Sequence, residues 1–145
     1  MIAQLLLALA LTAVTVVIHA VGTVRIVLPL SAIWRPGAGE LREAPRAIVP
    51  LIRLVSGLLL LHVLEMSLWA AAFAAIGIFS DFETSLYYSL KSYTTVGYGD
   101  VLPPTSWRLM GPIEAAVGVL MLGLSTGVIV AAVQRIYNRR DETGA

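Results

Sequence analysis

Three long apolar runs constrain this chain more than any other feature of its sequence. They cover residues 1–30, about 49–79 and about 107–137, and a segment rich in proline and glycine separates the first two. Each run is long enough to cross a hydrocarbon core of about 30 Å as a helix. Only 13% of the residues are charged, whereas soluble domains have about 25%. The sequence therefore predicts an all-α membrane protein with three transmembrane helices.

The first run has a second interpretation, a cleaved signal peptide. No lysine or arginine precedes it, and its apolar stretch is longer than the usual hydrophobic region of a signal. We therefore interpret residues 1–30 as a transmembrane helix that stays in place.

Arginines predict which side of the membrane each segment faces. They gather around the first linker and at the end of the third run: Arg25, Arg35, Arg42, Arg46, Arg53, Arg135, Arg139 and Arg140. Loops rich in lysine and arginine stay in the cytoplasm. We expect a multi-pass protein of the cell membrane, with a cytoplasmic linker (31–48), a short cytoplasmic tail (138–145) and the N-terminus outside.

A shorter segment, residues 80–106, lies between the second and third runs. Ser80 and Glu83 have the spacing of a capping box, which predicts a helix from near Asp81 to about Thr94. Such a helix is too short to span a bilayer but can re-enter it. Non-helical backbone at that depth is tolerated only where protein buries it or where it lines a water-filled path.

The motif that carries chemistry follows this helix, where residues 94–100 read Thr-Thr-Val-Gly-Tyr-Gly-Asp. Rings of backbone carbonyls can replace the water of an ion if successive carbonyls point the same way. Alternating left- and right-handed backbone achieves this, and Gly97 and Gly99 reach positive φ at no steric cost. Val96 and Tyr98 would then anchor the strand, and Thr95 would add a hydroxyl ring.

The segment Thr95–Gly99, with a short helix before it and a long apolar run after it, resembles the selectivity filter of the pore-loop family of potassium channels, and we call it the filter. The closest likeness is to small prokaryotic channels with a two-transmembrane pore domain, here with an additional N-terminal helix. The resemblance implies that residues 49–137 form the pore domain: outer helix, pore helix, filter and inner helix. It also implies a homotetramer in the lipid bilayer, because one pore loop per chain supplies one of four equivalent strands.

The implied function is passive, potassium-selective conduction, with K⁺ bound at Thr95, Val96, Gly97 and Tyr98 and with no other cofactor. Two alternatives are a pore subunit of a potassium uptake transporter and a non-conducting channel subunit. No nucleophile–base set suggests an enzyme, and we expect no nucleic-acid partner.

Several residues around the filter are candidates for its support. Thr94 and Asp100 flank it, and Lys91 lies one helical turn before it, where some family members have glutamate. A lysine at this depth is costly unless paired. Asp100 is the first candidate partner and Glu114 the second, with Glu65 also possible; the alternative is a lysine that extends to the surface.

Tyr87 and Tyr88 occupy positions where relatives have aromatic side chains that brace the filter tyrosine. We expect them to support Tyr98 by packing and a hydroxyl hydrogen bond. An interfacial aromatic belt is the alternative.

In the third run, the resemblance implies an inner-helix hinge at Gly123 or Gly118, although close helix packing explains small residues equally well. Helical spacing would then direct one face toward a central cavity, lined by Val119, Leu122, Thr126 and Val130.

Three polar residues interrupt the apolar runs: His19, His62 and Glu65. A proton sensor is one interpretation, because histidine titrates near physiological pH. The other, which we favour, is a hydrogen bond that holds the first helix to the second. The two histidines are far apart in sequence and cysteine is absent, so the sequence predicts no transition-metal site.

Overall fold

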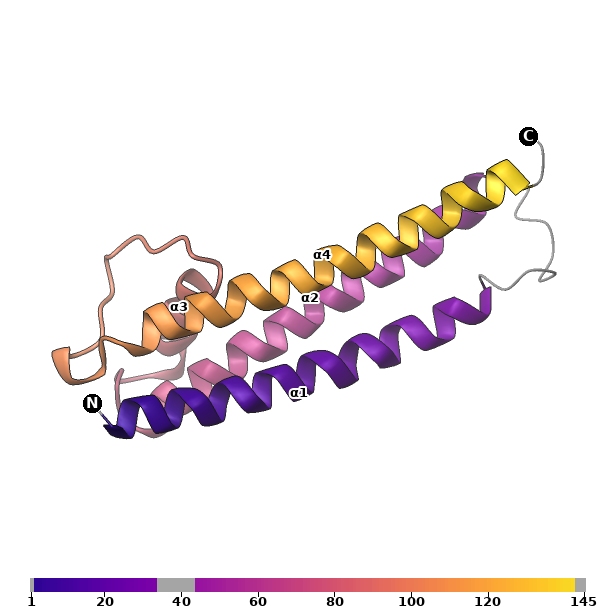
Figure 1. Ribbon diagram of the computed structural model, residues 1–145. Helices are drawn as coiled ribbons and strands as arrows, with labels where there is room; N and C mark the ends of the chain where they lie inside the picture. Colours follow the sequence, from indigo (N-terminus) through magenta and orange to yellow (C-terminus); the bar gives the residue numbers. More distant parts are fainter. Residues whose placement is uncertain (1, 34–43, 143–145) are drawn as a thin grey trace.

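The computed structural model describes residues 2–33 and 44–142, and every regular element in this part of the chain is helical. The elements are α1 (Ile2–Ile33), α2 (Ala44–Ala75), α3 (Phe82–Tyr93), a short 3-10 turn (Thr105–Trp107) and α4 (Met110–Glu142). Figure 1 shows α1, α2 and α4 side by side, with α3 at one end of them. The predicted all-α class is confirmed.

Three of the helices are long and apolar enough to cross a membrane. The candidate spans are Ile2–Leu30, Ile48–Ala75 and Thr105–Ile136. They coincide with the three predicted runs. Large apolar side chains are exposed along them, as lipid-facing positions require: Leu6, Leu9, Val17, Leu59, Leu60 and Leu120 are examples.

The helices extend further into the predicted connecting segments than the sequence suggested. Within the predicted linker, α1 continues to Ile33 and α2 already begins at Ala44, while Arg35 and Arg42 lie outside the described residues. Pro29 and Pro50 lie inside helices. Each proline removes one backbone hydrogen bond, but the adjoining apolar turns still form. Similarly, α4 continues to Glu142 through most of the predicted tail, whose residues 143–145 lie outside the described part.

A glycine ends α2 before the predicted limit at Phe79. Gly77 has φ of 70°. The N–H of Ile78 donates to the Phe73 carbonyl at 2.9 Å, and that of Gly77 to the Ala74 carbonyl at 3.1 Å. This is a Schellman motif, which satisfies the last carbonyls of the helix. It turns the chain sharply into α3.

Asp81, rather than Ser80, caps the start of α3. Its carboxylate accepts from the Thr84 backbone N–H at 2.7 Å, while the Ser80 hydroxyl donates to the same carboxylate at 2.8 Å. The backbone N–H of Thr84, with further hydrogen bonds, lowers the pKa of Asp81. The predicted capping box was therefore wrong by one residue, because an aspartate competes effectively for this position.

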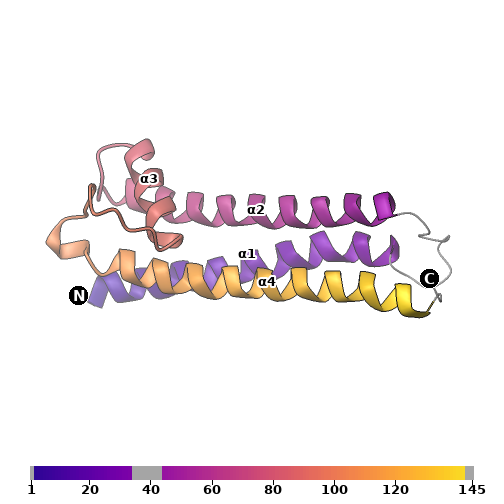
Figure 2. The same cartoon turned by 90° about the horizontal axis from the view of Figure 1, so that it is seen from above.

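The main core lies where α3 packs against α2 and α4 (Figure 2). Aromatic side chains dominate it, and the Phe73 and Tyr88 rings meet edge to face with centroids 5.6 Å apart. Its buried members are Ala8, Leu11, Met66, Trp69, Phe73, Ile78, Tyr88, Tyr93, Met110, Val117 and Met121. Because this core holds α3 on two sides, it fixes the point where the filter segment begins.

Gly118 lets α4 approach α3 closely. A Cβ atom at this position would collide with the backbone carbonyl of Tyr93. Nothing lies within 4 Å of the equivalent position at Gly123. The packing interpretation therefore accounts for Gly118, and α4 is continuous through both glycines. A hinge at Gly123 stays a prediction.

This difference predicts opposite effects of two matched substitutions. Gly118→Ala should destabilise the protein by about 1–3 kcal/mol, because backbone has to move to admit the methyl group. Gly123→Ala should change stability little or raise it by up to about 1 kcal/mol, because alanine favours the helix. Thermal unfolding of the detergent-solubilised protein measures both. Equal melting temperatures for the two variants would contradict the close contact.

Candidate functional site

The segment predicted as a filter leaves α3 at its carboxyl end. Thr94 caps the helix, its N–H donating to the Leu90 carbonyl at 3.2 Å. The N–H of Gly97 turns back to the Lys91 carbonyl at 3.1 Å. The C-terminus of a helix carries partial negative charge, so a cation is favoured close to this turn.

Backbone handedness alternates along the filter segment. The φ angles of Thr95, Gly97 and Gly99 are 63°, 55° and 77°, and Thr95 is the one non-glycine residue of positive φ among the described residues. Val96 and Tyr98 therefore separate left-handed positions. The two glycines behave as their residue type predicts. The positive φ of Thr95 was not predicted, because a β-branched residue is strained in this conformation. Strain of this kind is concentrated at functional sites.

Within one chain, little of the protein covers the filter side chains. Val96 is 51% exposed and Tyr98 is 75% exposed. The segment lies at the end of the molecule, beside α3 and the start of α4 (Figure 1). Its side chains are thus free to meet neighbouring molecules.

Lys91 and Asp100 meet beside the filter, as their positions around it suggested. Lys91 Nζ donates to Asp100 Oδ1, and Tyr87 Oη donates to Asp100 Oδ2 at 2.6 Å. The lysine side chain is 6% exposed and the aspartate 48%. The Lys91 ammonium, followed by the Tyr87 hydroxyl, lowers the pKa of Asp100 to about 2. The same hydrogen bond to Asp100 raises the pKa of Tyr87.

Within one chain, Tyr87 and Tyr88 of α3 do not make the expected contacts with Tyr98. Tyr87 gives its hydroxyl to Asp100. Tyr88 is buried, and its ring contacts Phe73 and Phe79 at centroid distances of 5.6 and 4.9 Å. Tyr87 therefore holds the residue after the filter, and Tyr88 anchors the pore helix in the core.

Glu114 lies apart from Lys91, in a second polar contact between helices. It is fully buried on α4, and the Ser89 hydroxyl of α3 lies 2.5 Å from its Oε1 atom and 2.8 Å from the Met66 carbonyl of α2. Ser89 was not predicted from the sequence, because a serine in a helix is usually exposed. Glu114 thus holds α3 against α4.

A third polar cluster joins all four helices. His19 Nδ1 of α1 lies 2.9 Å from Glu65 Oε1 of α2, which is the interhelical hydrogen bond that the sequence favoured. His62 Nδ1 lies 3.2 Å from Glu65 Oε2, and its Nε2 lies 2.9 Å from Ser125 Oγ of α4. Tyr93 of α3 donates its hydroxyl to Glu65. Tyr93 and Ser125 were missed, because only the fold brings them here.

The same cluster brings together two histidines that are far apart in sequence. Their ring centroids are 5.3 Å apart. His19, His62 and Glu65 are all buried, and their ligand atoms lie within 4.8 Å of one another.

The residues expected to line a cavity are exposed in the single chain. Val119, Leu122, Thr126 and Val130 recur at helical spacing on α4, and all four are exposed. The Thr126 hydroxyl donates to the Leu122 carbonyl at 2.9 Å, which satisfies it without a partner helix.

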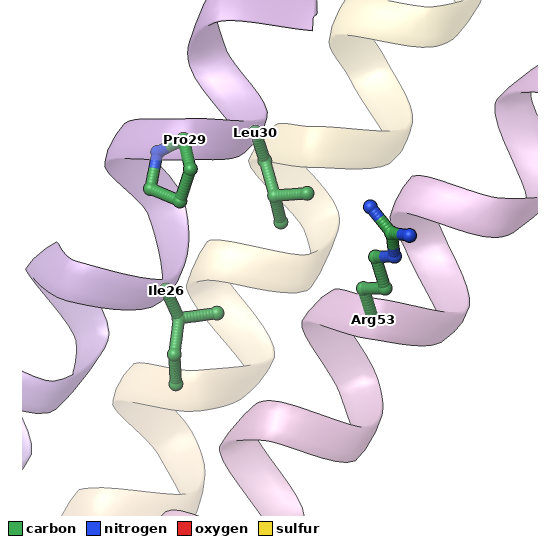
Figure 3. A pocket seen from close by; sticks show the side chains of 4 residues that line it. All are labelled: Ile26, Pro29, Leu30 and Arg53. Atoms are coloured by element: carbon green, nitrogen blue, oxygen red, sulfur yellow. The ribbon is translucent and has the colours of Figure 1, made fainter.

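A hollow between α1 and α2 lies far from the filter. It has a volume of about 270 Å³ and is lined by Ile26, Pro29, Leu30 and Arg53, which Figure 3 shows from close by. Its lining residues lie toward the end of α1 and the start of α2.

Comparison with known proteins places this geometry in a family. A family model described as "Ion channel" matches residues 61–135, just over half of the chain. The chain belongs to this ion channel family. The family consists of channels rather than enzymes, and the match covers the second half of α2, all of α3, the filter segment and most of α4.

Similar curated proteins are potassium channels by name. TWiK family of potassium channels protein 18 of Caenorhabditis elegans is 42% identical over 89 residues, 61% of this chain and 17% of that protein. The A-type voltage-gated potassium channel KCND3 of Homo sapiens is 37% identical over 64 residues, 43% of this chain and 10% of that protein. The chain thus matches less than a fifth of the length of either relative. No solved structure matches it.

The contact of Lys91 with Asp100 predicts a pH dependence. A carboxyl whose pKa falls on folding from 3.8 to about 2 stabilises the protein above pH about 4, and this stabilisation is lost as the pH falls through about 2. In Lys91→Met the Asp100 pKa should rise toward 3.8, since Tyr87 alone remains as its side-chain partner. Carboxyl NMR titration measures the shift.

A double-mutant cycle tests the same pair by stability. Lys91→Met and Asp100→Asn should each lower the melting temperature at pH 7, and together they should lower it by less than the sum, because both remove one interaction. Glu83→Gln, an exposed carboxylate change on the same helix, is the control and should add independently. Strict additivity for Lys91 and Asp100 would show that the pair makes no energetic contribution.

Proposed function

We propose that this protein is the pore-forming subunit of a potassium-selective channel, and that K⁺ passes through Thr95–Gly99. The alternating backbone handedness of this segment carries the proposal. Alternation of this kind turns successive carbonyls toward one side, where they can replace the hydration shell of an ion. The ion channel family, and relatives named as potassium channels, support the choice of ion.

The surroundings of the segment suit a cation path. The carboxyl end of α3 directs its partial negative charge toward the start of the filter. At the far end, Asp100 is held by Lys91 and Tyr87. The backbone at both ends of the filter is therefore tied to α3, which keeps the carbonyl positions fixed while ions move.

One chain has a single filter strand, so we propose a homotetramer around a central axis. Four copies would enclose the path and would cover Val96 and Tyr98, which are exposed in one chain. The exposed face of α4 at Val119, Leu122, Thr126 and Val130 would then line an inner cavity. K⁺ would bind at Thr95, Val96, Gly97 and Tyr98.

We assign residues 49–137 to the pore domain and residues 1–30 to an additional membrane helix. In the cell membrane, the filter and the N-terminus would face outside and the C-terminus would face the cytoplasm. The structure supports this sidedness in one respect: the start of α1 and the filter segment lie at one end, and the end of α4 at the other (Figure 1). The arginine distribution supplies the direction.

Purified protein in liposomes tests the proposal against its two alternatives. We expect flux of K⁺ without any other subunit, and bi-ionic reversal potentials that give a K⁺ permeability far above that of Na⁺. A transporter subunit would require its partner or a coupled ion, and a non-conducting subunit would show no flux. Comparable permeability to both ions would also contradict the proposal.

Gly97→Ala should abolish K⁺ flux, because alanine resists the positive φ that the filter requires there. Gly77→Ala is the matched control, since Gly77 has a similar φ of 70° at the end of α2, outside the filter. Both variants should lose some thermal stability, but only Gly97→Ala should lose conduction while it still forms tetramers by native mass spectrometry. Full flux through Gly97→Ala would exclude Gly97 from the filter.

A further inference from the structure

The cluster around Glu65 holds two imidazoles, a carboxylate and a phenol in a small buried volume. These groups come from α1, α2 and α3, whose arrangement Figure 1 shows. We propose that His19, His62, Glu65 and Tyr93 form a binding site for a divalent transition-metal ion of the zinc class. The site depends on these contacts and not on ion conduction.

The spacing of the donor atoms suits such an ion. In a tetrahedral zinc site the bonds are about 2.0–2.1 Å long, which places neighbouring donors about 3.3 Å apart. His19 Nδ1 and His62 Nδ1 lie 2.9 and 3.2 Å from the two oxygens of Glu65. Tyr93 Oη lies 3.0 Å from His62 Nδ1. One ligand atom from each of His19, His62 and Glu65 lies within 4.8 Å of the other two. Small changes of the side-chain torsions can shorten the longest of these separations to the zinc value.

Charge also favours a divalent cation. Glu65 is fully buried within the span Ile48–Ala75, where a carboxylate without a cationic partner is costly. Its hydrogen-bond partners among the described residues are His19, His62 and Tyr93, not an arginine or lysine. Two neutral imidazoles, one carboxylate and one phenolate balance a double positive charge, with the phenol proton released to solvent. The occupied site would be neutral, as a membrane interior requires.

The surroundings orient one ligand and leave another incompletely bonded. His62 Nε2 lies 2.9 Å from Ser125 Oγ, and a hydrogen bond to the second ring nitrogen is the usual way a ligating histidine is held. His19 is 3% exposed, yet its Nε2 has no hydrogen-bond partner. Buried polar atoms are rarely left unsatisfied. The hydrogen-bond network therefore does not use the full capacity of His19.

A metal ion here would act on the filter from behind. Tyr93 is the last residue of α3 and precedes Thr95 by two positions. Coordination of Tyr93 together with His19 would join α1 to the carboxyl end of the pore helix through one ion. Zinc-class ions would thereby stiffen the support of the filter, and this gives the additional helix a regulatory role.

The composition of the chain allows a clean binding experiment. It contains two histidines and no cysteine, so protein purified without a polyhistidine tag has few competing ligands. We expect one Zn²⁺ per chain by elemental analysis after equilibration and removal of free metal. Co²⁺ in place of Zn²⁺ should give the intense visible absorption of a four-coordinate site, and Zn²⁺ should displace it. Affinity should rise with pH, because the ligands bind in their deprotonated forms.

Variants separate this site from adventitious binding. His19→Gln and His62→Gln should each weaken Zn²⁺ binding by at least about tenfold, and Tyr93→Phe should change the Co²⁺ spectrum. Glu114→Gln alters the other fully buried carboxylate, which has no histidine partner, and should leave binding unchanged. Zn²⁺ should also raise the melting temperature of the unmodified protein, an effect that a chelator reverses.

Two results would overturn the proposal. One is that the folded, unmodified protein binds no stoichiometric Zn²⁺ and shows no shift in melting temperature with Zn²⁺. This test does not depend on whether any variant folds. The other is unchanged binding in the variant that lacks both histidines. Because binding is measured without flux, a failure here leaves potassium conduction untouched, and a protein that does not conduct can still bind the metal.

Discussion

The contact between the carboxyl end of α3 and the surface of α4 sets the geometry on which the filter depends. At Gly118 the absence of a side chain lets the Tyr93 carbonyl sit directly against α4. The Tyr93 ring is fully buried in the core, and its hydroxyl reaches Glu65 on α2. One residue is thus fixed through its backbone, ring and hydroxyl, and the filter begins two positions later. Any movement of Tyr93 would therefore also displace Thr95.

Among the described residues, three buried or half-buried polar contacts each centre on one carboxylate. Asp100 binds Lys91 and Tyr87, Glu114 binds Ser89, and Glu65 binds histidines and Tyr93. In every case α3 supplies at least one partner. Apolar packing between membrane helices has little hydrophobic driving force, so these directional contacts give the short pore helix its orientation. The apolar core around Phe73 and Tyr88 then excludes other arrangements.

Features encoded by local residue types were predictable from the sequence. The length of each apolar run gave the three long helices, glycine chemistry gave positive φ at Gly97 and Gly99, and the positions of Lys91 and Asp100 around a tight turn gave their contact. Features that depend on the fold were not. Tyr93 and Ser125 join the Glu65 cluster only because four helices cross there, and the hydroxyl of Tyr87 turns to Asp100 rather than Tyr98. The helix caps at Gly77 and Asp81 were predictable only to within a few residues, since several neighbouring residues could have formed each cap.

A hydrogen bond between the Trp69 indole and Thr15 makes the first helix part of the packed structure. The indole nitrogen of Trp69, on α2, donates to the Thr15 hydroxyl of α1 at 3.0 Å, and both side chains are fully buried. Removal of residues 1–30 would expose this indole to lipid and leave its N–H unsatisfied. Glu65, on the same helix, would lose its partner His19. We therefore expect the chain without residues 1–30 to be less stable than the full chain. The ring also supplies a built-in optical probe, because its emission depends on whether the first helix is in place.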